Sequence, residues 1–127
     1  MNKNDIINRL EDLNFDKTGY WVLAGSAMVL HGVRPETHDI DLGCTKEFAD
    51  ELEKCGYPIA VMPDGTRRIT YAEDMEIFED WIFDRVVFVE EIPVISLEGL
   101  LEMKRNLGRE KDLRDIQMIE EFLKTRR

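Results

Sequence analysis

The sequence predicts an α/β (α+β) domain, in which a mixed β-sheet is flanked by helices and residues 1–127 form a single unit. Short apolar runs that end at glycines indicate strands, and amphipathic stretches between them indicate helices. No repeat, low-complexity stretch or linker divides the chain. A chain of 127 residues has the size of one ordinary domain and is long enough to bury a core.

The first quarter of the chain alternates between helical and extended patterns. Residues 4–14 place isoleucines and leucines at helical spacing, with Asn4 as the expected cap. Residues 18–25 form an apolar run that ends in glycine, which predicts a buried strand. Residues 26–32 predict a short helix that begins at Ser26, because serine is a favoured N-cap and the segment closes with glycine.

The remainder predicts one further helix, the rest of the sheet and a helical C-terminus. Residues 38–44 alternate polar and apolar side chains as a half-buried strand does, and residues 46–56 are amphipathic at helical spacing. Extended patterns follow at residues 57–62, 66–72, 75–83 and 85–96, the last of which forms one or two strands. Two helices are then expected, at residues 96–107 and 109–124.

Composition excludes several classes of protein. The net charge of -10 argues against non-specific binding to nucleic acid, which requires basic side chains to neutralise phosphates. No apolar run approaches the roughly 20 residues that span a bilayer, and the N-terminal segment lacks the apolar core of a signal peptide. We therefore expect a cytoplasmic protein with no membrane partner. Cys44 and Cys55 stand in no CxxC pair and are expected to be reduced thiols.

Charge is distributed unevenly along the chain. Residues 104–127 carry eight basic and five acidic side chains, so this segment is basic beside an acidic body. Such an arrangement suits a cation-dependent site flanked by side chains that attract phosphate. An ordinary solvated helix with mixed charges explains the same pattern equally well.

The segment around Asp39 and Asp41 carries the most chemical information. Side chains alternate along a strand, so these two carboxylates point to the same face while Ile40 points to the other. Two neighbouring carboxylates repel each other unless a positive charge lies between them. A hard divalent cation, Mg²⁺ (or Mn²⁺), takes oxygen ligands and keeps positions open for substrate phosphates. The alternative is a strand with one solvated face that carries two acids.

A second motif lies directly upstream of the carboxylates. The apolar strand runs into Gly25 and Ser26 and then into a helix, whose N-terminus offers unpaired amides to a phosphate. Glycine permits a phosphate to approach the backbone closely, and the serine hydroxyl can donate a further hydrogen bond to it. Arg34, in the loop between the two motifs, is either a further phosphate contact or an ordinary surface arginine. Taken alone, the turn is equally consistent with a capped strand-to-helix connection.

The combination of Gly25-Ser26, twelve intervening residues and Asp39-Ile40-Asp41-Leu42 resembles the DNA polymerase beta-type nucleotidyltransferase superfamily. The small size resembles minimal nucleotidyltransferases, including the abortive-infection toxin type found in toxin–antitoxin pairs. The resemblance implies a nucleotidyltransferase-like fold, ATP or another nucleoside triphosphate (NTP) as substrate, a divalent metal and a possible partner subunit.

The resemblance also implies roles for later residues. It places a third metal-binding carboxylate on a later strand, where Glu76 is the first candidate and Asp74 the second. Near the C-terminus, it implies that Lys104 and Lys111 contact the nucleotide. Asp112 and Asp115 lie three residues apart on one helix face, from which they orient either lysine. Ordinary salt bridging within and between helices is the alternative.

These expectations define an enzyme hypothesis. The protein transfers a nucleoside monophosphate from an NTP to an acceptor hydroxyl on a small molecule, a protein or an RNA end. Asp39, Asp41, Glu76 and Lys104 are its catalytic residues, the first three as metal ligands; Gly25, Ser26, Lys104 and Lys111 hold the nucleotide. The alternative is a nucleotide- or metal-binding module with weak or no turnover, including one half of a toxin–antitoxin pair. A third reading is an unrelated α/β protein.

Overall fold

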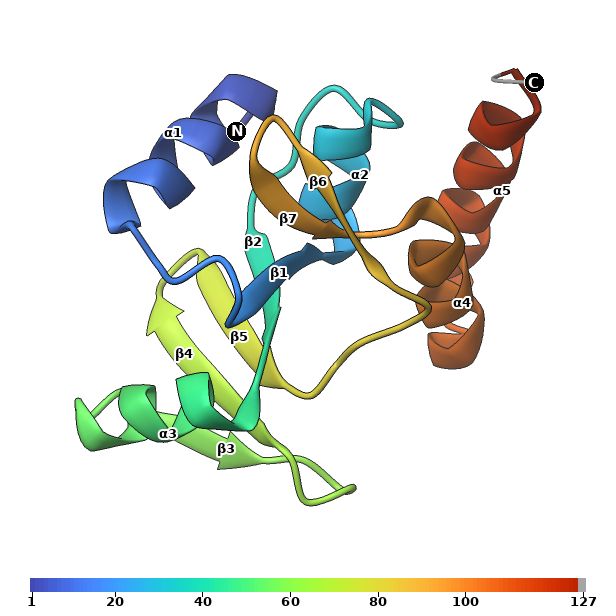
Figure 1. The fold of residues 1–127 in the computed structure, drawn as a ribbon. Helices are drawn as coiled ribbons and strands as arrows, with labels where there is room; N and C mark the ends of the chain where they lie inside the picture. Colours follow the sequence, from blue (N-terminus) through green and yellow to red (C-terminus); the bar gives the residue numbers. More distant parts are fainter. Residues whose placement is uncertain (126–127) are drawn as a thin grey trace.

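The computed structural model describes residues 1–125, which form five helices and one mixed sheet of seven strands (Figure 1). The helices are α1 (Lys3–Leu13), α2 (Ala24–His31), α3 (Lys46–Lys54), α4 (Leu97–Leu107) and α5 (Glu110–Thr125). The strands are β1 (Tyr20–Leu23), β2 (Ile40–Cys44), β3 (Ile59–Val61), β4 (Arg67–Ala72), β5 (Met75–Glu79), β6 (Val86–Val89) and β7 (Ile92–Ile95). The predicted fold class is confirmed.

The sheet has the strand order β3-β4-β5-β2-β1-β7-β6. β2 runs parallel to β5 and β1 runs parallel to β7, whereas the other neighbouring pairs are antiparallel. All four residues of β1 are buried, and so are all four of β7. Strands covered on both faces consist of continuous apolar residues, which explains why β1 has no polar alternation.

The helices cover the sheet unequally. α2 packs against β1, β2 and β7, and both α1 and α4 pack against α2. This position explains why five consecutive residues of α2, Ser26 to Leu30, are buried, since a helix enclosed on all sides is apolar all round. α5 packs on α4, whereas α3 packs on β4 in the lower part of Figure 1, away from α4 and α5.

Two helix starts differ from the sequence prediction. The cap of α1 is Asn2, whose side chain accepts from the Asp5 amide while the Asp5 carboxylate accepts from the Asn2 amide, so the predicted cap Asn4 is wrong. α2 begins at Ala24, two residues before the predicted start, and Ser26 is not its cap. The reason is that Ala24 has a φ of 54° and turns the strand directly into the helix.

The later strands also differ in length from the prediction. The strand expected over residues 75–83 ends at Glu79, because Asp80 has a φ of 58° and turns the chain away. The segment 85–96 forms two strands, joined by a tight turn at Glu90 and Glu91, which both have positive φ. These turns use non-glycine residues in the left-handed region, which composition does not reveal.

Gly43 in the middle of β2 allows a close approach that any side chain would block. A Cβ at this position would lie 2.0 Å from Nε1 of Trp21 and 2.7 Å from the carbonyl oxygen of Trp81. The Trp21 indole therefore crosses β2 and donates a 2.7 Å hydrogen bond to that carbonyl. This contact fixes the segment that follows β5 against the centre of the sheet.

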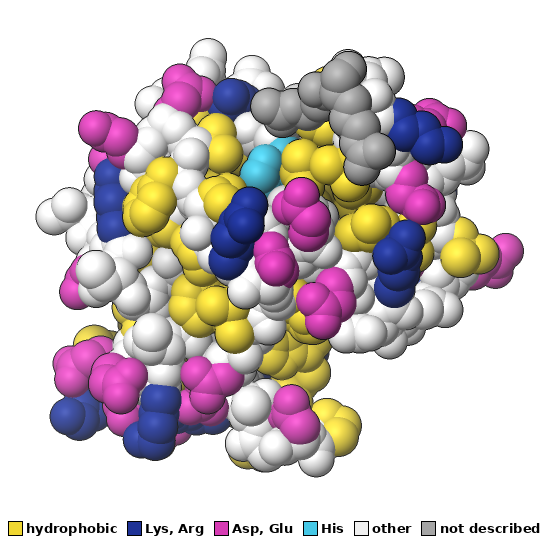
Figure 2. All heavy atoms as spheres, turned by 45° about the vertical axis from the view of Figure 1, so that its right-hand side comes forward, with side chains coloured by type: hydrophobic (Ala, Val, Ile, Leu, Met, Phe, Trp, Pro, Cys, Tyr) yellow, Lys and Arg dark blue, Asp and Glu magenta, His cyan; other side chains and the backbone are white. Residues whose placement is uncertain are grey.

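The molecular surface mixes charged and apolar groups. On the face shown in Figure 2, acidic and basic side chains lie among patches of hydrophobic ones. Across residues 1–125, no helix combines the length and the apolarity that a bilayer crossing requires. Both cysteines are free thiols, as expected; Cys44 is buried, which raises the pKa of its thiol to about 12, and Cys55 is exposed.

Candidate active site

Three carboxylates meet at one end of the β2–β5 pair. Asp39 lies immediately before β2, Asp41 lies within it, and Asp41 is the direct cross-strand neighbour of Glu76 in β5. Neighbouring residues in a ladder point to the same face, so the two side chains lie together. All three residues line a cavity of about 280 Å³, which Arg68, Glu73, Asp74 and Phe78 also line.

The environment of Asp41 makes its ionised form costly. Burial raises the pKa of its carboxyl from 3.8 to about 6, and the negative charges of Asp39 and Glu76 contribute further. The positive charges of Lys104 and Lys111 act in the opposite direction. A carboxylate with these neighbours gains most from an added cation, because the cation offsets both burial and repulsion.

The two candidates for the third carboxylate differ in their partners. Asp74 forms an ion pair with Arg9 of α1, and this hydrogen bond holds the pKa of the Asp74 carboxyl below its usual value. Within residues 1–125, the Oε2 atom of Glu76 is buried without a hydrogen-bond partner, although it lies 3.3 Å from Nε of Arg68. Both carboxylates therefore lie beside an arginine, and the register favours Glu76, because Glu76 is the direct cross-strand neighbour of Asp41.

The donor set suits a hard divalent cation. Asp39, Asp41 and Glu76 supply only oxygen atoms, one of them buried and unsatisfied, which are the ligands that Mg²⁺ and Mn²⁺ prefer. In the described part of the chain, however, no group of three acidic, histidine or cysteine side chains is already gathered as a ligand cage.

The turn between β1 and α2 faces the same acids. Ala24 and Gly25 line a second cavity, of about 390 Å³, together with Asp39 and Asp41. A Cβ at Gly25 would lie 3.0 Å from Nη1 of Arg34 and 3.1 Å from Oγ1 of Thr37, so glycine lets the following loop close onto the turn.

Ser26 lies beside the acids but below the surface. Its side chain is fully buried, its hydroxyl donates to the Leu23 carbonyl at 2.7 Å, and it accepts from the Asp41 amide at 3.2 Å. Ser26 lines neither cavity at the carboxylates. In this geometry Ser26 ties α2 to β2 and holds the backbone of Asp41, which differs from the direct phosphate contact expected of it.

Four basic side chains line the second cavity: Arg34 from the loop after α2, Lys104 from α4, Arg109 from the connection between α4 and α5, and Lys111 from α5. Lys104 is buried, with its Nζ 3.1 Å from Asp115 and 3.5 Å from Asp112. Of the two lysines that these aspartates were expected to orient, Lys104 is the one that they contact.

The same two aspartates also bind arginines. Arg109 contacts Asp112 with its side chain, at 2.7 Å and 3.1 Å, and these bonds lower the pKa of the Asp112 carboxyl. Arg34 contacts Asp115 at 2.5 Å and thereby links the loop after α2 to α5. Arg109 lay outside the predicted set, and only its position beside the expected Lys111 and Asp112 hinted at a role.

Asp39 and Asp41 thus form the wall that the two cavities share. One cavity is predominantly acidic, and the other is lined by Gly25 and by four basic and three acidic side chains. The structure brings together Gly25, Asp39, Asp41, Lys104 and Lys111 around one cavity and Glu76 with both aspartates around the other. An anionic ligand that carries a divalent cation fits this division of charge.

Comparison with known proteins supports the fold. The sequence matches no protein-family model and no curated protein. The structure is similar to that of the lincosamide antibiotic adenylyltransferase LnuA with lincomycin bound, with a TM-score of 0.55, 18% identity, and coverage of 91% of this chain and 92% of that one. It is also similar to the candidate nucleotidyltransferase TM1012 from Thermotoga maritima, with a TM-score of 0.60, 21% identity, and coverage of 98% and 96%. The chain has a nucleotidyltransferase-like fold.

The raised pKa of Asp41 makes a prediction about stability. The unfolded chain ionises this carboxyl near its ordinary pKa of 3.8 and the folded chain near 6, so the folded state loses stability as pH rises between these values. Without divalent cations, Asp41→Asn should therefore raise the free energy of unfolding at pH 7.5 by about 2 kcal/mol, and the gain should vanish below about pH 4. Urea denaturation across this pH range measures the difference.

Asp12→Asn is the matched control, because Asp12 is an exposed acid outside both cavities. It should leave the pH dependence of stability unchanged. A destabilising Asp41→Asn, or a gain that is the same at pH 4 and pH 7.5, would contradict the described environment of Asp41.

Proposed function

We propose that this protein is a nucleotidyltransferase that transfers a nucleoside monophosphate from an NTP to an acceptor hydroxyl and releases pyrophosphate. The observation that carries the proposal is that Asp39 and Asp41 line both cavities. They separate a basic cavity, suited to a triphosphate, from an acidic one that contains Glu76. The fold supports the same conclusion.

The basic cavity supplies the means to hold the triphosphate. Gly25 lets the loop that carries Arg34 close onto the start of α2, which brings the Arg34 guanidinium to the same cavity as Lys104 and Lys111. Asp112 and Asp115 fix Lys104 in place, so its charge is positioned before the nucleotide arrives. Positioning and electrostatic stabilisation of this kind are the main contributions a protein makes to phosphoryl-group transfer.

Asp39, Asp41 and Glu76 would hold a divalent cation, Mg²⁺ or Mn²⁺, which neutralises phosphate charge when it is bound. Residues of the chain itself carry out the proton transfer and the positioning. The Glu76 carboxylate, on the lining of the acidic cavity, would accept the proton of the acceptor hydroxyl. Ser26 keeps Asp41 in place through the backbone, so the pair of aspartates stays aligned between nucleotide and acceptor.

The acidic cavity, with a volume of about 280 Å³, lies on the acceptor side of the aspartates. This size favours a small molecule or a single protein side chain over a large RNA, and the net charge of -10 disfavours RNA further. LnuA, which shares the fold, is an adenylyltransferase for a small-molecule antibiotic. The proposal places the reaction in the cytoplasm. It also includes a partner subunit.

One observation favours the alternative of a binding module with weak turnover, of the kind found in toxin–antitoxin pairs. Arg68 of β4 lies 3.3 Å from the Glu76 carboxylate and offers it an internal cation. An arginine in this position competes with a metal for Glu76. The two functions differ in turnover, since a module would bind nucleotide without transferring any part of it.

Calorimetry of ATP, GTP, CTP and UTP in the presence of Mg²⁺ tests the nucleotide site. We expect saturable binding of at least one NTP, and Asp39→Asn/Asp41→Asn should weaken it at least about tenfold, because the metal loses two ligands. A labelled-nucleotide transfer assay on the NTP that binds then separates the enzyme from the module. Absence of binding by the unmodified protein, or equal binding by the double variant, would refute both functions.

The basic side chains that line the second cavity lead to a separate prediction. Lys111→Ala should weaken NTP binding by about fivefold and reduce its dependence on salt, because this exposed lysine contributes long-range attraction to the triphosphate. Lys124→Ala, which removes an exposed lysine at the other end of α5, is the control and should change neither quantity. Equal effects of the two variants would assign the attraction to overall charge and not to the cavity.

A further inference from the structure

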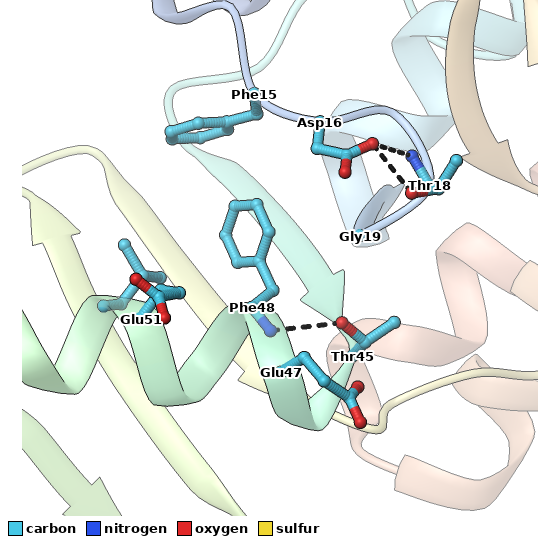
Figure 3. A pocket seen from close by; sticks show the side chains of 9 residues that line it. Phe15, Asp16, Thr18, Gly19, Thr45, Glu47, Phe48 and Glu51 are labelled. Atoms are coloured by element: carbon cyan, nitrogen blue, oxygen red, sulfur yellow. Dashed lines mark hydrogen bonds between the residues drawn. The ribbon is translucent and has the colours of Figure 1, made fainter.

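A third cavity lies at the opposite end of the β1–β2 pair from the carboxylates. It has a volume of about 540 Å³ and is bounded by the segment before β1 and the first turns of α3 (Figure 3). Tyr20 pairs with Cys44 at this end of the two strands, whereas Leu23 pairs with Asp41 at the other. Tyr20 and Leu23 are three residue steps apart along β1, roughly 10 Å at about 3.3 Å per residue. The cavity is therefore distinct from the proposed nucleotide site.

The two walls of this cavity are held in place by the backbone. The Thr45 amide donates to the Gly19 carbonyl at 3.0 Å, which joins the segment before β1 to the start of α3. The Thr45 hydroxyl accepts from the Phe48 amide at 3.2 Å and caps α3, as Figure 3 shows. These bonds form the cavity before any ligand binds, which lowers the cost of binding.

Aromatic side chains form the apolar lining. In Figure 3, Phe48 rises from α3 toward Phe15, and the two rings meet edge to face with centroids 5.2 Å apart. Phe15 packs in the same manner on Tyr20 and Tyr71, at 5.8 Å and 5.3 Å, so neither phenylalanine is loosely held. Leu52 adds aliphatic surface.

Acidic side chains surround this aromatic surface. Asp16, Glu47 and Glu51 line the cavity, and among the residues that the structure describes no lysine, arginine or histidine does so. Thr18 donates to the Asp16 carboxylate from its amide at 2.9 Å and from its hydroxyl at 2.7 Å. These bonds hold the pKa of Asp16 below its usual value, so the side chain is ionised at neutral pH.

We propose that this cavity binds a small organic cation with an aromatic or otherwise apolar body. A phenylalanine ring attracts a cation through its face, and the three carboxylates on the lining add to that attraction. The volume is in the range of cavities that hold drug-sized molecules. The absence of a basic side chain from the lining in residues 1–125 argues against nucleotides and other anions as occupants.

N-methylquinolinium tests the proposal, with quinoline as its uncharged counterpart at slightly alkaline pH. Titration calorimetry should show saturable binding of the cation with a Kd at least about fivefold lower than that of quinoline, because only the cation interacts favourably with the carboxylates. In a ¹⁵N-labelled sample, the cation should shift the amide signals of Gly19, Thr45 and Phe48. The signals of Gly25 and Asp41 should stay unchanged.

Variants of exposed acids complete the test. Glu47→Gln/Glu51→Gln should weaken binding of N-methylquinolinium by about fivefold, since both carboxylates lie on the lining. Glu102→Gln/Glu121→Gln removes the same charge from exposed positions outside the cavity and should leave the affinity unchanged. Equal affinity for quinoline, shifts centred elsewhere, equal effects of the two double variants, or no binding would each overturn the proposal. None of these outcomes bears on nucleotide binding.

Discussion

The parallel pairing of β2 with β5 is the constraint on which the site depends. It places Asp41 directly beside Glu76, residues 35 positions apart in the chain, on the same face of the sheet. Antiparallel pairing of β1 with β2 then sets Leu23, just before the turn at Gly25, opposite Asp41. A shift of one residue in either ladder would turn the side chains of the shifted strand to the other face of the sheet and separate the carboxylates from the basic cavity.

Local patterns predicted the parts of the site that depend on neighbouring residues. Alternation along a strand sufficed to place Asp39 and Asp41 on one face, and a glycine at the end of an apolar run located the turn at Gly25. Spacing on a helix likewise indicated that Asp112 and Asp115 share a face and contact a lysine, but it left open whether that lysine is Lys104, as the structure shows, or Lys111. Each inference needs only the geometry of one element, which the sequence encodes over a few residues.

Local sequence patterns could not predict the features that depend on contacts between distant segments. Strand order decided that Glu76, and not Asp74, stands beside Asp41, while Arg9 from α1 binds Asp74. The helix begins at Ala24, whose positive φ no composition signals, so Ser26 lies inside α2 and its hydroxyl donates to the Leu23 carbonyl. The third cavity arises where the segment before β1 meets α3, so its lining residues share no motif.

Paramagnetic relaxation by Mn²⁺, added with a non-hydrolysable NTP, shows where the metal binds. The amide signals of Gly25, Ile40 and Ile77 should broaden first, because they surround the carboxylates on two strands and the adjoining turn. The signals of Gly19 and Phe48, at the far end of β1 and β2, should stay sharp at the same Mn²⁺ concentration. Broadening spread evenly over the acidic surface, or centred away from Asp41, would contradict a metal-nucleotide site at these strands.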